Sequence, residues 1–408
     1  MAISKSEFES AGTRGTIPRV IDRDLAARLK AVARKFPCVT VTGPRQSGKS
    51  TLCRAVFPRH TYANLEAPDV RAFATQDPRA FLSQFPKGAV IDEVQRCPEL
   101  PSYLQERIDA DPASGRWILT GSQNLTLLAS ISQSLAGRTA VLNLLPLARS
   151  EVHRFEPHPR TLDEALLTGG YPRILDQRLS PSDWLGSYVG TYIERDVRSV
   201  ANVGDLVAFQ RFVGLCAGRT AQFVNYSSLA ADASVSQPTA KAWLSVLETS
   251  FIVFRLPVYS GNTRKRLVKM PKLHFHDTGL VCWLLGIRNV DQVRLHPLRG
   301  AIFETWVVSE VLKHRVNRGE AGGLFAWRDR HGTEADLLIE RPAGLTLVEV
   351  KAGQTPSADM ADSLRRVREA VTPPGPVDTI VVYGGDARQK RPDVTFLPWD
   401  DIQAHGWT

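Results

Sequence analysis

Residues 43–50 of the chain are Gly43-Pro44-Arg45-Gln46-Ser47-Gly48-Lys49-Ser50, which match the P-loop pattern G-x-x-x-x-G-K-[ST] at every required position. The β-branched segment Cys38-Val39-Thr40-Val41-Thr42 predicts a strand immediately before this loop. Apolar residues at Leu52 and Val56 predict a helix after it, which Pro58 ends. Because the motif has the strand and helix that phosphate binding needs, it predicts a nucleotide site rather than an ordinary glycine-rich turn.

The two glycines of the motif let the backbone curl, so that successive N–H groups point inward around a β-phosphate. Lys49 is expected to contact the β- and γ-phosphates, and Ser50 to ligate Mg²⁺. Arg45 is expected to lie at the surface of the loop. The predicted ligands are ATP and Mg²⁺, and the predicted nucleotide-binding residues are Gly43, Pro44, Arg45, Gln46, Ser47, Gly48, Lys49, Ser50 and Thr51.

A second chemical signal is Ala89-Val90-Ile91-Asp92-Glu93, an apolar strand that ends in two carboxylates. Asp92 is expected to bind the magnesium ion through water. Glu93 is expected to polarise the attacking water as general base, beside the catalytic Lys49. The alternative is a solvated strand end, which is less favoured after a P-loop at this distance.

Further buried strands are predicted at His60–Leu65, Ala89–Ile91, Trp117–Leu119 and Ala140–Leu144, with helical stretches between them. This alternation favours a parallel sheet with helices on both faces. We therefore expect an α/β nucleotide-binding domain over residues 1–150, which begins with a helix over Ile17–Phe36.

The texture changes after this domain, where helical periodicity appears at Leu162–Leu167 and Trp184–Val200 around a break at Gly169-Gly170-Tyr171-Pro172. Tyr226–Tyr259 then gives helix, turn, helix and strand, the order of a winged helix. Residues 151–299 are expected to form this helical connector and winged-helix domain. A basic run follows, and its charges would lie near a DNA backbone unless it is only a solvated loop: Arg264, Lys265, Arg266, Lys269 and Lys272.

Residues 300–408 are expected to form a third domain, in which three chemical groups come together. Glu304 lies on a predicted helix, Asp336 starts a strand, and Glu349 and Lys351 share one face of the next strand. Two carboxylates would hold magnesium, and the ammonium would orient water or stabilise developing phosphate charge. The alternative is a half-exposed strand edge with a salt bridge.

Three resemblances add to these predictions. Trp117-Ile118-Leu119-Thr120-Gly121-Ser122 and Gly137-Arg138 resemble segments of the AAA+ branch of P-loop ATPases. The resemblance implies that Thr120 or Ser122 senses the γ-phosphate. It also implies that Arg138 supplies a positive charge to the transition state, in its own subunit or in a neighbour; a solvated surface arginine is the alternative.

The C-terminal pattern is similar to the PD-(D/E)xK nuclease superfamily, with Ala335 where that pattern has proline. The resemblance places Asp336 and Glu349 at metal-ligand positions, Lys351 at the catalytic lysine and Glu304 at the helical acid, so the predicted metal ligands are Ser50, Asp92, Glu304, Asp336 and Glu349. The expected fold class is α/β: a P-loop NTPase parallel sheet with flanking helices, a helical and winged-helix middle region, and an α/β restriction-endonuclease-like domain.

The full chain resembles a large prokaryotic group of uncharacterised AAA-type ATPases with a C-terminal domain of unknown function. The segments that carry this resemblance are Val39 to Arg138, Gly169-Gly170-Tyr171-Pro172, His276-Asp277-Thr278-Gly279-Leu280 and Phe303-Glu304. The leading hypothesis is an ATP-hydrolysing ATPase that acts on DNA through the winged helix and the nuclease-like domain. The alternative is a nucleotide-dependent switch or protein-remodelling ATPase whose C-terminal domain binds a partner without cleaving nucleic acid. An arginine acting on a neighbour would favour a homo-oligomer.

Bulk properties of the 408-residue chain agree with a multidomain globular protein. The net charge of +9 suits a phosphate-bearing partner without requiring one. No run of 18 apolar residues occurs, which predicts no membrane partner and a cytoplasmic location. The five scattered cysteines form neither a disulfide framework nor a zinc motif and are expected to be buried thiols.

Overall fold

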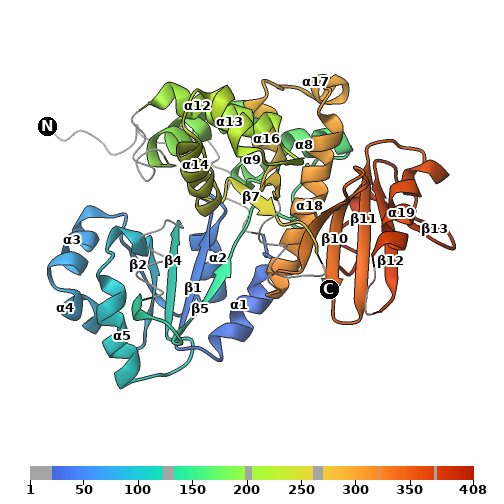
Figure 1. Ribbon diagram of the computed structural model, residues 1–408. Helices are drawn as coiled ribbons and strands as arrows, with labels where there is room; N and C mark the ends of the chain where they lie inside the picture. Colours follow the sequence, from blue (N-terminus) through green and yellow to red (C-terminus); the bar gives the residue numbers. More distant parts are fainter. Residues whose placement is uncertain (1–20, 123–132, 198–204, 261–269, 321, 372–374) are drawn as a thin grey trace, which may run out of the picture.

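The computed structural model describes residues 21–122, 133–197, 205–260, 270–320, 322–371 and 375–408 (Figure 1). Its first part is a five-stranded parallel sheet in the order β2-β3-β4-β1-β5. The strands are β1 (Cys38–Gly43), β2 (Thr61–Asn64), β3 (Ala89–Asp92), β4 (Trp117–Ser122) and β5 (Thr139–Asn143). The predicted parallel sheet is confirmed, and each strand overlaps its predicted position.

Helices cover both faces of this sheet, as the alternation of apolar residues requires. Ile91 and Leu119 face one hydrophobic cluster, together with α3 (Pro68–Gln76), α4 (Pro78–Ser83) and α5 (Leu100–Ala110). Val90 and Ile118 face the other cluster, under α1 (Leu25–Ala33) and α2 (Lys49–Val56). α1 is shorter than the predicted Ile17–Phe36, whose first four residues lie outside the described part of the chain.

The middle region is mainly helical. Its helices before the small sheet are α7 (Arg149–Val152), α8 (Leu162–Thr168), α9 (Pro172–Asp176), α10 (Pro181–Tyr188), the π-helical η2 (Val189–Val197) and α12 (Leu206–Gly218). The predicted single helix over Trp184–Val200 is therefore an α-helix continued by a π-helix as far as Val197.

A small antiparallel sheet follows in the order β6-β8-β7. Its strands are β6 (Gln222–Phe223), β7 (Val253–Leu256) and β8 (Lys272–Phe275). The helices α13 (Tyr226–Ala233) and α14 (Gln237–Thr249) lie between β6 and β7 in the sequence. The predicted order of helix, turn, helix and strand is observed here. Two short helices, α16 (Thr278–Leu284) and α17 (Val290–Leu295), lead to the C-terminal part.

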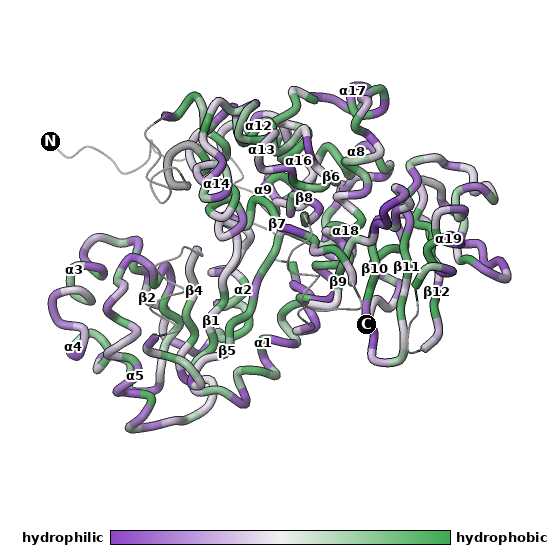
Figure 2. Tube along the Cα trace, viewed as in Figure 1, coloured by the Kyte–Doolittle hydropathy of each residue, from purple (hydrophilic) through white to green (hydrophobic). Residues whose placement is uncertain are grey.

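The C-terminal part is a six-stranded mixed sheet, β13-β14-β12-β11-β10-β9, which packs against the long helix α18 (Arg299–Arg318). The strands are β9 (Leu324–Arg328), β10 (Glu334–Arg341), β11 (Gly344–Lys351), β12 (Val377–Tyr383), β13 (Gln389–Lys390) and β14 (Thr395–Pro398), and α19 (Asp362–Ala370) packs against β10 and β11. Hydrophobic residues predominate along β10, β11 and β12, whereas α19 is largely hydrophilic (Figure 2). β10 and β11 are antiparallel, and β11 and β12 are parallel.

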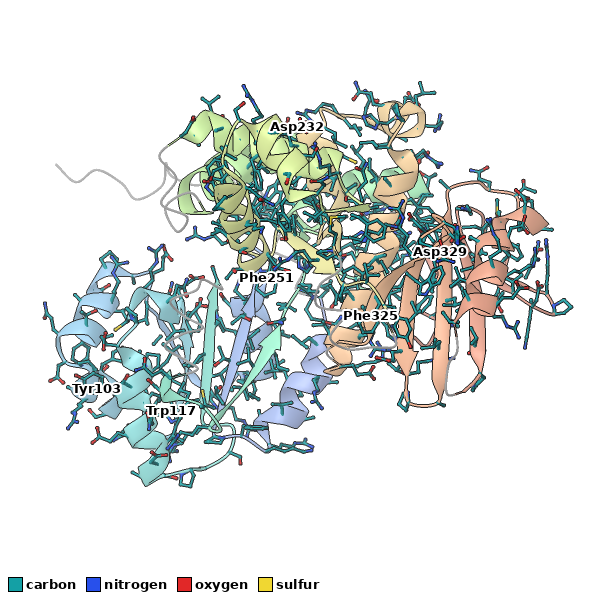
Figure 3. All side chains as sticks on the ribbon, in the orientation of Figure 1. Tyr103, Trp117, Asp232, Phe251, Phe325 and Asp329 are labelled. Atoms are coloured by element: carbon teal, nitrogen blue, oxygen red, sulfur yellow. The ribbon has the colours of Figure 1, made fainter. Side chains whose placement is uncertain are left out.

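The middle and C-terminal parts share one hydrophobic core. A single cluster of buried side chains extends from Leu162 to Trp407. The backbone adds a bridge between Val258 and Ala326, which joins the end of β7 to β9. Packing is therefore continuous across residue 300. Figure 3 shows Trp117 in the first sheet and Phe325 in the C-terminal sheet, both of which are buried.

All five cysteines are buried and free, as predicted. None of the helices in the described part of the chain combines the length and the apolar character that a membrane crossing requires.

Candidate functional site

The P-loop joins the carboxyl end of β1 directly to α2, which begins at Lys49. Gly48 has φ 92°, a left-handed conformation that glycine adopts without steric cost. Gly43 has a different constraint: a Cβ there would lie 2.2 Å from the carbonyl oxygen of Leu144. The backbone path therefore requires both glycines: Gly48 for its φ angle, and Gly43 because Leu144, just after the neighbouring strand β5, lies so close.

Lys49 lies at the centre of this loop. Its buried ammonium donates to the carbonyl oxygens of Pro44 at 2.7 Å and Gly43 at 3.1 Å. Burial lowers the pKa of Lys49 to about 8, although the carboxylates of Glu93 and Asp92 oppose this shift. An anionic ligand would stabilise the ammonium form further, so the position suits a triphosphate.

Two hydroxyls beside the loop are buried without a hydrogen-bond partner among the described residues: Ser47 Oγ and Ser122 Oγ. Ser122 ends β4 and pairs in register with Gly43, so it lies at the start of the loop. A buried hydroxyl without a partner costs free energy, which a polar ligand at this edge of the sheet would recover. The donor set of the loop therefore fits a bound nucleotide.

Asp92 is held by two hydroxyls from the neighbouring strands. Tyr62 on β2 donates to its Oδ2 at 2.5 Å, and Thr120 on β4 donates to its Oδ1. Tyr62 was not predicted, because its contact depends on β2 lying beside β3 rather than on any motif. The structure thus brings Thr120 to the carboxylate of Asp92 and Ser122 to the loop, while their roles as sensors stay a prediction.

Glu93 directly follows β3 with φ 57°, a left-handed conformation that is uncommon for a residue with a side chain. Such strain concentrates at functional positions. Gln95 donates to Glu93 Oε2, and burial raises the pKa of the Glu93 carboxyl, partly offset by Lys49. A carboxyl with a raised pKa suits a general base that works near neutral pH.

These groups open into a cavity of about 660 Å³, large enough for a nucleotide. Lys49, Ser50 and Glu93 line it, together with residues from α1, α9 and the segment after α7, including Phe155 and Arg173. Arg45 is half-buried rather than fully exposed, with its guanidinium 5.5 Å from the centre of the Tyr192 ring.

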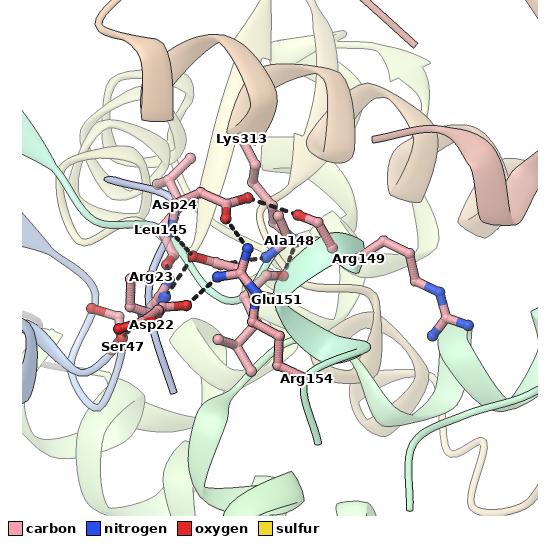
Figure 4. Close-up of polar contacts among 12 residues, drawn as sticks. Asp22, Arg23, Asp24, Ser47, Leu145, Ala148, Arg149, Glu151, Arg154 and Lys313 are labelled. Carbon is pink, nitrogen blue, oxygen red and sulfur yellow. Dashed lines mark hydrogen bonds and ion pairs between the residues drawn. The ribbon is translucent and has the colours of Figure 1, made fainter. Parts of the chain in front are cut away.

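Arg23 was also missed by sequence reasoning, because it lies before the motif and its side chain bonds to residues far away in the sequence. Its side chain is buried and reaches the P-loop, where Nη1 donates to the Ser47 carbonyl oxygen at 2.6 Å (Figure 4). Nη2 donates to the Leu145 carbonyl oxygen at 2.9 Å, and Nε to Glu151 Oε1 at 2.8 Å. A single guanidinium thus links the loop to the segment that follows β5.

Arg138 lies at the amino-terminal ends of the strands, opposite the P-loop, so it is too far away for the predicted role in its own subunit. It directly precedes β5, whose first residue pairs with Cys38 at the start of β1, whereas the P-loop follows the other end of β1. The two edges are roughly 20 Å apart, at about 3.3 Å per strand residue. Arg138 instead pairs with Asp109 through Nε at 2.5 Å and Nη2 at 2.8 Å. Its action on a neighbouring subunit stays a prediction.

The predicted C-terminal residues do come together, but around an unexpected lysine. Lys272 of β8 is 3% exposed, and its ammonium lies 2.6 Å from Glu304 Oε1 and 3.3 Å from Asp336 Oδ1. The second oxygen of Asp336 accepts the backbone N–H of Val350 at 2.9 Å. Lys351 contacts Glu349 at 2.6 Å. An ammonium thus lies between the helical acid and the strand aspartate.

The charges of this acidic cluster, Glu304, Asp336 and Glu349 with Lys272 and Lys351, shift each other's pKa values. Burial raises the pKa of Glu349 to about 7, with a further contribution from Asp336, and burial also raises that of Glu304. Burial opposes the charged form of Lys272, but Glu304 and Asp336 outweigh it and raise the pKa of Lys272. The lysine therefore stays an ammonium.

This arrangement does not fit the predicted metal site of Glu304, Asp336 and Glu349. Across the residues that the structure describes, no group of three histidine, cysteine or acidic side chains is placed to hold a metal ion. The physical reason is Lys272, whose ammonium occupies the position between the carboxylates where a cation would bind. The predicted catalytic roles of Glu349 and Lys351 in magnesium-dependent cleavage stay a prediction.

The prediction that Lys272 contacts DNA as part of the basic run is wrong. Lys272 is buried in the acidic cluster and cannot contact a phosphate backbone. The other members of the run, Arg264, Lys265, Arg266 and Lys269, lie outside the described residues.

One protein-family model agrees with the first site. A family model described as an AAA domain matches residues 35–153. Two models described as domains of unknown function match residues 159–291 (DUF8612) and 299–402 (DUF4143). Among solved structures, the Walker-type ATPase PABY2304 of Pyrococcus abyssi is 16% identical, with 65% of this chain and 96% of that chain covered and a TM-score of 0.44. A point variant of RuvB from Thermotoga maritima is 18% identical, with 60% and 92% covered and a TM-score of 0.31.

The matched domain and the loop geometry define an AAA-type P-loop ATPase domain in the N-terminal part of the chain. Over 391 residues the chain is 30% identical to the uncharacterized protein Rv2008c of Mycobacterium tuberculosis, with 94% of this chain and 85% of the relative covered. The uncharacterized protein Mb2031c of Mycobacterium bovis matches to the same extent. The chain belongs to the same family as these two mycobacterial proteins.

Proposed function

We propose that the chain hydrolyses ATP with the help of magnesium. The observation that carries this proposal is the placement of Lys49, Ser50 and Glu93 around one cavity, with Asp92 at the end of the strand that leads into Glu93. Ser50 and Asp92 are the residues that would hold Mg²⁺, which neutralises phosphate charge when bound. Lys49 binds the phosphates, and Glu93 orients the attacking water and takes its proton.

The test of this proposal is nucleotide binding by Lys49→Ala, measured by calorimetry with ATP and Mg²⁺. We expect the affinity for ATP to fall about tenfold or more, because the variant lacks the ammonium at the centre of the loop. An ion pair between an ammonium and a phosphate is worth more than about 1.4 kcal/mol. Lys35→Ala is the matched control, since Lys35 is exposed and lies before the start of β1. If Lys49→Ala binds ATP as tightly as Lys35→Ala, the loop is not the nucleotide site.

We further propose that the middle region contacts DNA as a winged helix, without cleavage by the C-terminal sheet. The order α12-β6-α13-α14-β7-β8 supports the winged-helix assignment, and the net charge of +9 suits a phosphate backbone. Within the described residues, α14 exposes one cation, Lys241, which favours backbone contact over base readout. We also keep two further proposals: domain boundaries at 150/151 and 299/300, and assembly into a homo-oligomer.

Stimulation of the ATPase by duplex DNA separates this proposal from a switch or protein-remodelling ATPase. We expect the rate of phosphate release to rise severalfold with DNA and the stimulation to fall steeply with added salt, because released counterions drive binding to phosphates. Strand scission, scored in the same samples, is expected to be absent. An ATPase rate that is indifferent to DNA at low salt would favour the alternative.

A further inference from the structure

The short segment 144–151, which connects β5 of the ATPase domain to the rest of the chain, is held from two sides. One side of this segment lies against the P-loop. Leu144 N–H donates to the Thr42 carbonyl oxygen at 2.8 Å, and the Leu144 carbonyl lies against Gly43. A displacement of the P-loop therefore bears directly on the start of this segment.

Arg23 fixes the direction of one peptide group of the P-loop. It binds the Ser47 carbonyl oxygen, and in a planar trans peptide the C=O of Ser47 and the N–H of Gly48 point in opposite directions. The position of the guanidinium thus sets where the Gly48 N–H points, and P-loop amides are the groups that bind phosphate. Arg23 is a positioning residue in this sense, because it acts through the loop backbone.

Glu151 ties Arg23 to the connecting segment. It is fully buried, and its Oε1 accepts Arg23 Nε at 2.8 Å and Asp24 N–H at 2.7 Å. Its Oε2 accepts Ala148 N–H at 2.8 Å. Both carboxylate oxygens are thereby satisfied, so the guanidinium cannot move without disturbing the backbone at Ala148 (Figure 4).

The other side of the segment is held by α18 of the C-terminal part. Glu310 is 1% exposed, and its Oε2 accepts the Arg149 N–H at 2.7 Å. Lys313 donates to the Leu147 carbonyl oxygen at 3.0 Å and to Glu310 Oε1 at 2.8 Å. Gln403 donates to Glu310 Oε2 at 2.7 Å, which extends the network to the C-terminal end of the chain.

We propose that Arg23, Glu151 and Glu310 form a buried polar relay that couples nucleotide occupancy of the P-loop to the position of α18. The relay rests on the proposed binding of ATP and adds its regulation. Its two halves meet in the backbone at Ala148 and Arg149, and the side-chain links on either side are charge-assisted hydrogen bonds between buried groups, so none of them can break without leaving an unpaired polar group. Since α18 packs on the C-terminal sheet and beside β8, nucleotide binding would reach both other parts of the chain.

The decisive variant is Glu310→Gln, because Glu310 touches neither the loop nor the cavity. We expect ATP affinity to fall about fivefold or more, the lower end of measured allosteric couplings. Arg299→Gln is the matched control: it removes an ion pair of the same helix, Arg299 Nε to Asp163 Oδ1 at 2.7 Å, which has no link to the loop. Wild-type affinity in Glu310→Gln, or an equal loss in Arg299→Gln, would overturn the relay.

Hydrogen exchange provides the reciprocal readout, since coupling acts in both directions. ATP is expected to slow amide exchange in α18 of the wild type, but not in Arg23→Gln. Arg23→Lys serves as the second variant if Arg23→Gln does not fold, because it keeps the charge but cannot donate to Ser47, Leu145 and Glu151 at once with the geometry of a guanidinium. Unchanged α18 exchange on ATP binding to the wild type would contradict the proposal.

The relay can also fail or hold independently of the nucleotide. In the protein without ATP, Glu310→Gln is expected to speed amide exchange at residues 44–50 relative to Arg299→Gln. If the wild type does not bind ATP but this difference appears, the proposed function fails while the mechanical link stands. If ATP binds and no difference appears, the link fails alone.

Discussion

Glu93→Gln is expected to lower the rate of ATP hydrolysis by roughly 10²- to 10⁴-fold, the range that a general base contributes. Glutamine keeps the size and polarity of the side chain, so its contact with Gln95 and the turn after β3 should survive. ATP binding is expected to stay near the wild-type level, because Lys49 and the loop amides are unchanged. Single-turnover phosphate release and calorimetric binding, measured on the same preparation, check the two halves of this prediction.

The pH profile gives the same prediction a second readout. Burial raises the pKa of Glu93 above the usual value of a glutamate. A general base works only when deprotonated, so the wild-type rate should rise as pH increases through that raised pKa and then level off. The residual rate of Glu93→Gln should not show this rise.

Glu99→Gln is the matched control, since Glu99 is exposed and lies just before α5. It should keep both the rate and the pH profile. Hydrolysis by Glu93→Gln at a rate close to that of the wild type would exclude Glu93 as the base and leave another group to orient the water.

The parts of the fold and site that the sequence predicts are those encoded locally. The P-loop needs a strand, two glycines and a helix close together, and all are visible in the chain from Cys38 to Val56. The strands of the first sheet are short apolar runs, and their alternation with helices gives the parallel arrangement. Asp92 and Glu93 follow from the same logic, because carboxyl ends of parallel strands meet at one edge.

The contacts that sequence reasoning missed depend on long-range packing. Tyr62 reaches Asp92 only because β2 lies beside β3, and no motif marks it. Arg23 meets Glu151 across 128 residues, and Lys272 meets Asp336 across 64. Arg138 shows the converse problem: its local motif is plain, but the edge of the sheet at which it lies is set by the direction of β5.

Lys272→Met is expected to destabilise the protein by about 3–5 kcal/mol, the usual effect of removing one partner of a buried ion pair. Methionine keeps the unbranched stem but leaves Glu304 and Asp336 without their ammonium, which also lies 5.8 Å from the centre of the Phe223 ring. Urea unfolding of the wild type and the variant measures the difference. Lys351→Met is the matched control: Lys351 lies in the same cluster but its side chain is 40% exposed, so solvent screens its loss and a smaller effect is expected.

Added Mn²⁺ then tests whether Lys272 excludes a metal ion from the acidic cluster. If Lys272 takes the place of a cation, Mn²⁺ without nucleotide should leave wild-type stability unchanged and restore part of the stability that Lys272→Met loses, because a ligand that binds only the folded state stabilises it. Equal stabilisation of both proteins would mean that the carboxylates bind metal with the lysine in place. No stabilisation of the variant would mean that the three carboxylates, even when freed, do not converge on one ion, and that their cluster serves only to anchor β8 to the C-terminal sheet.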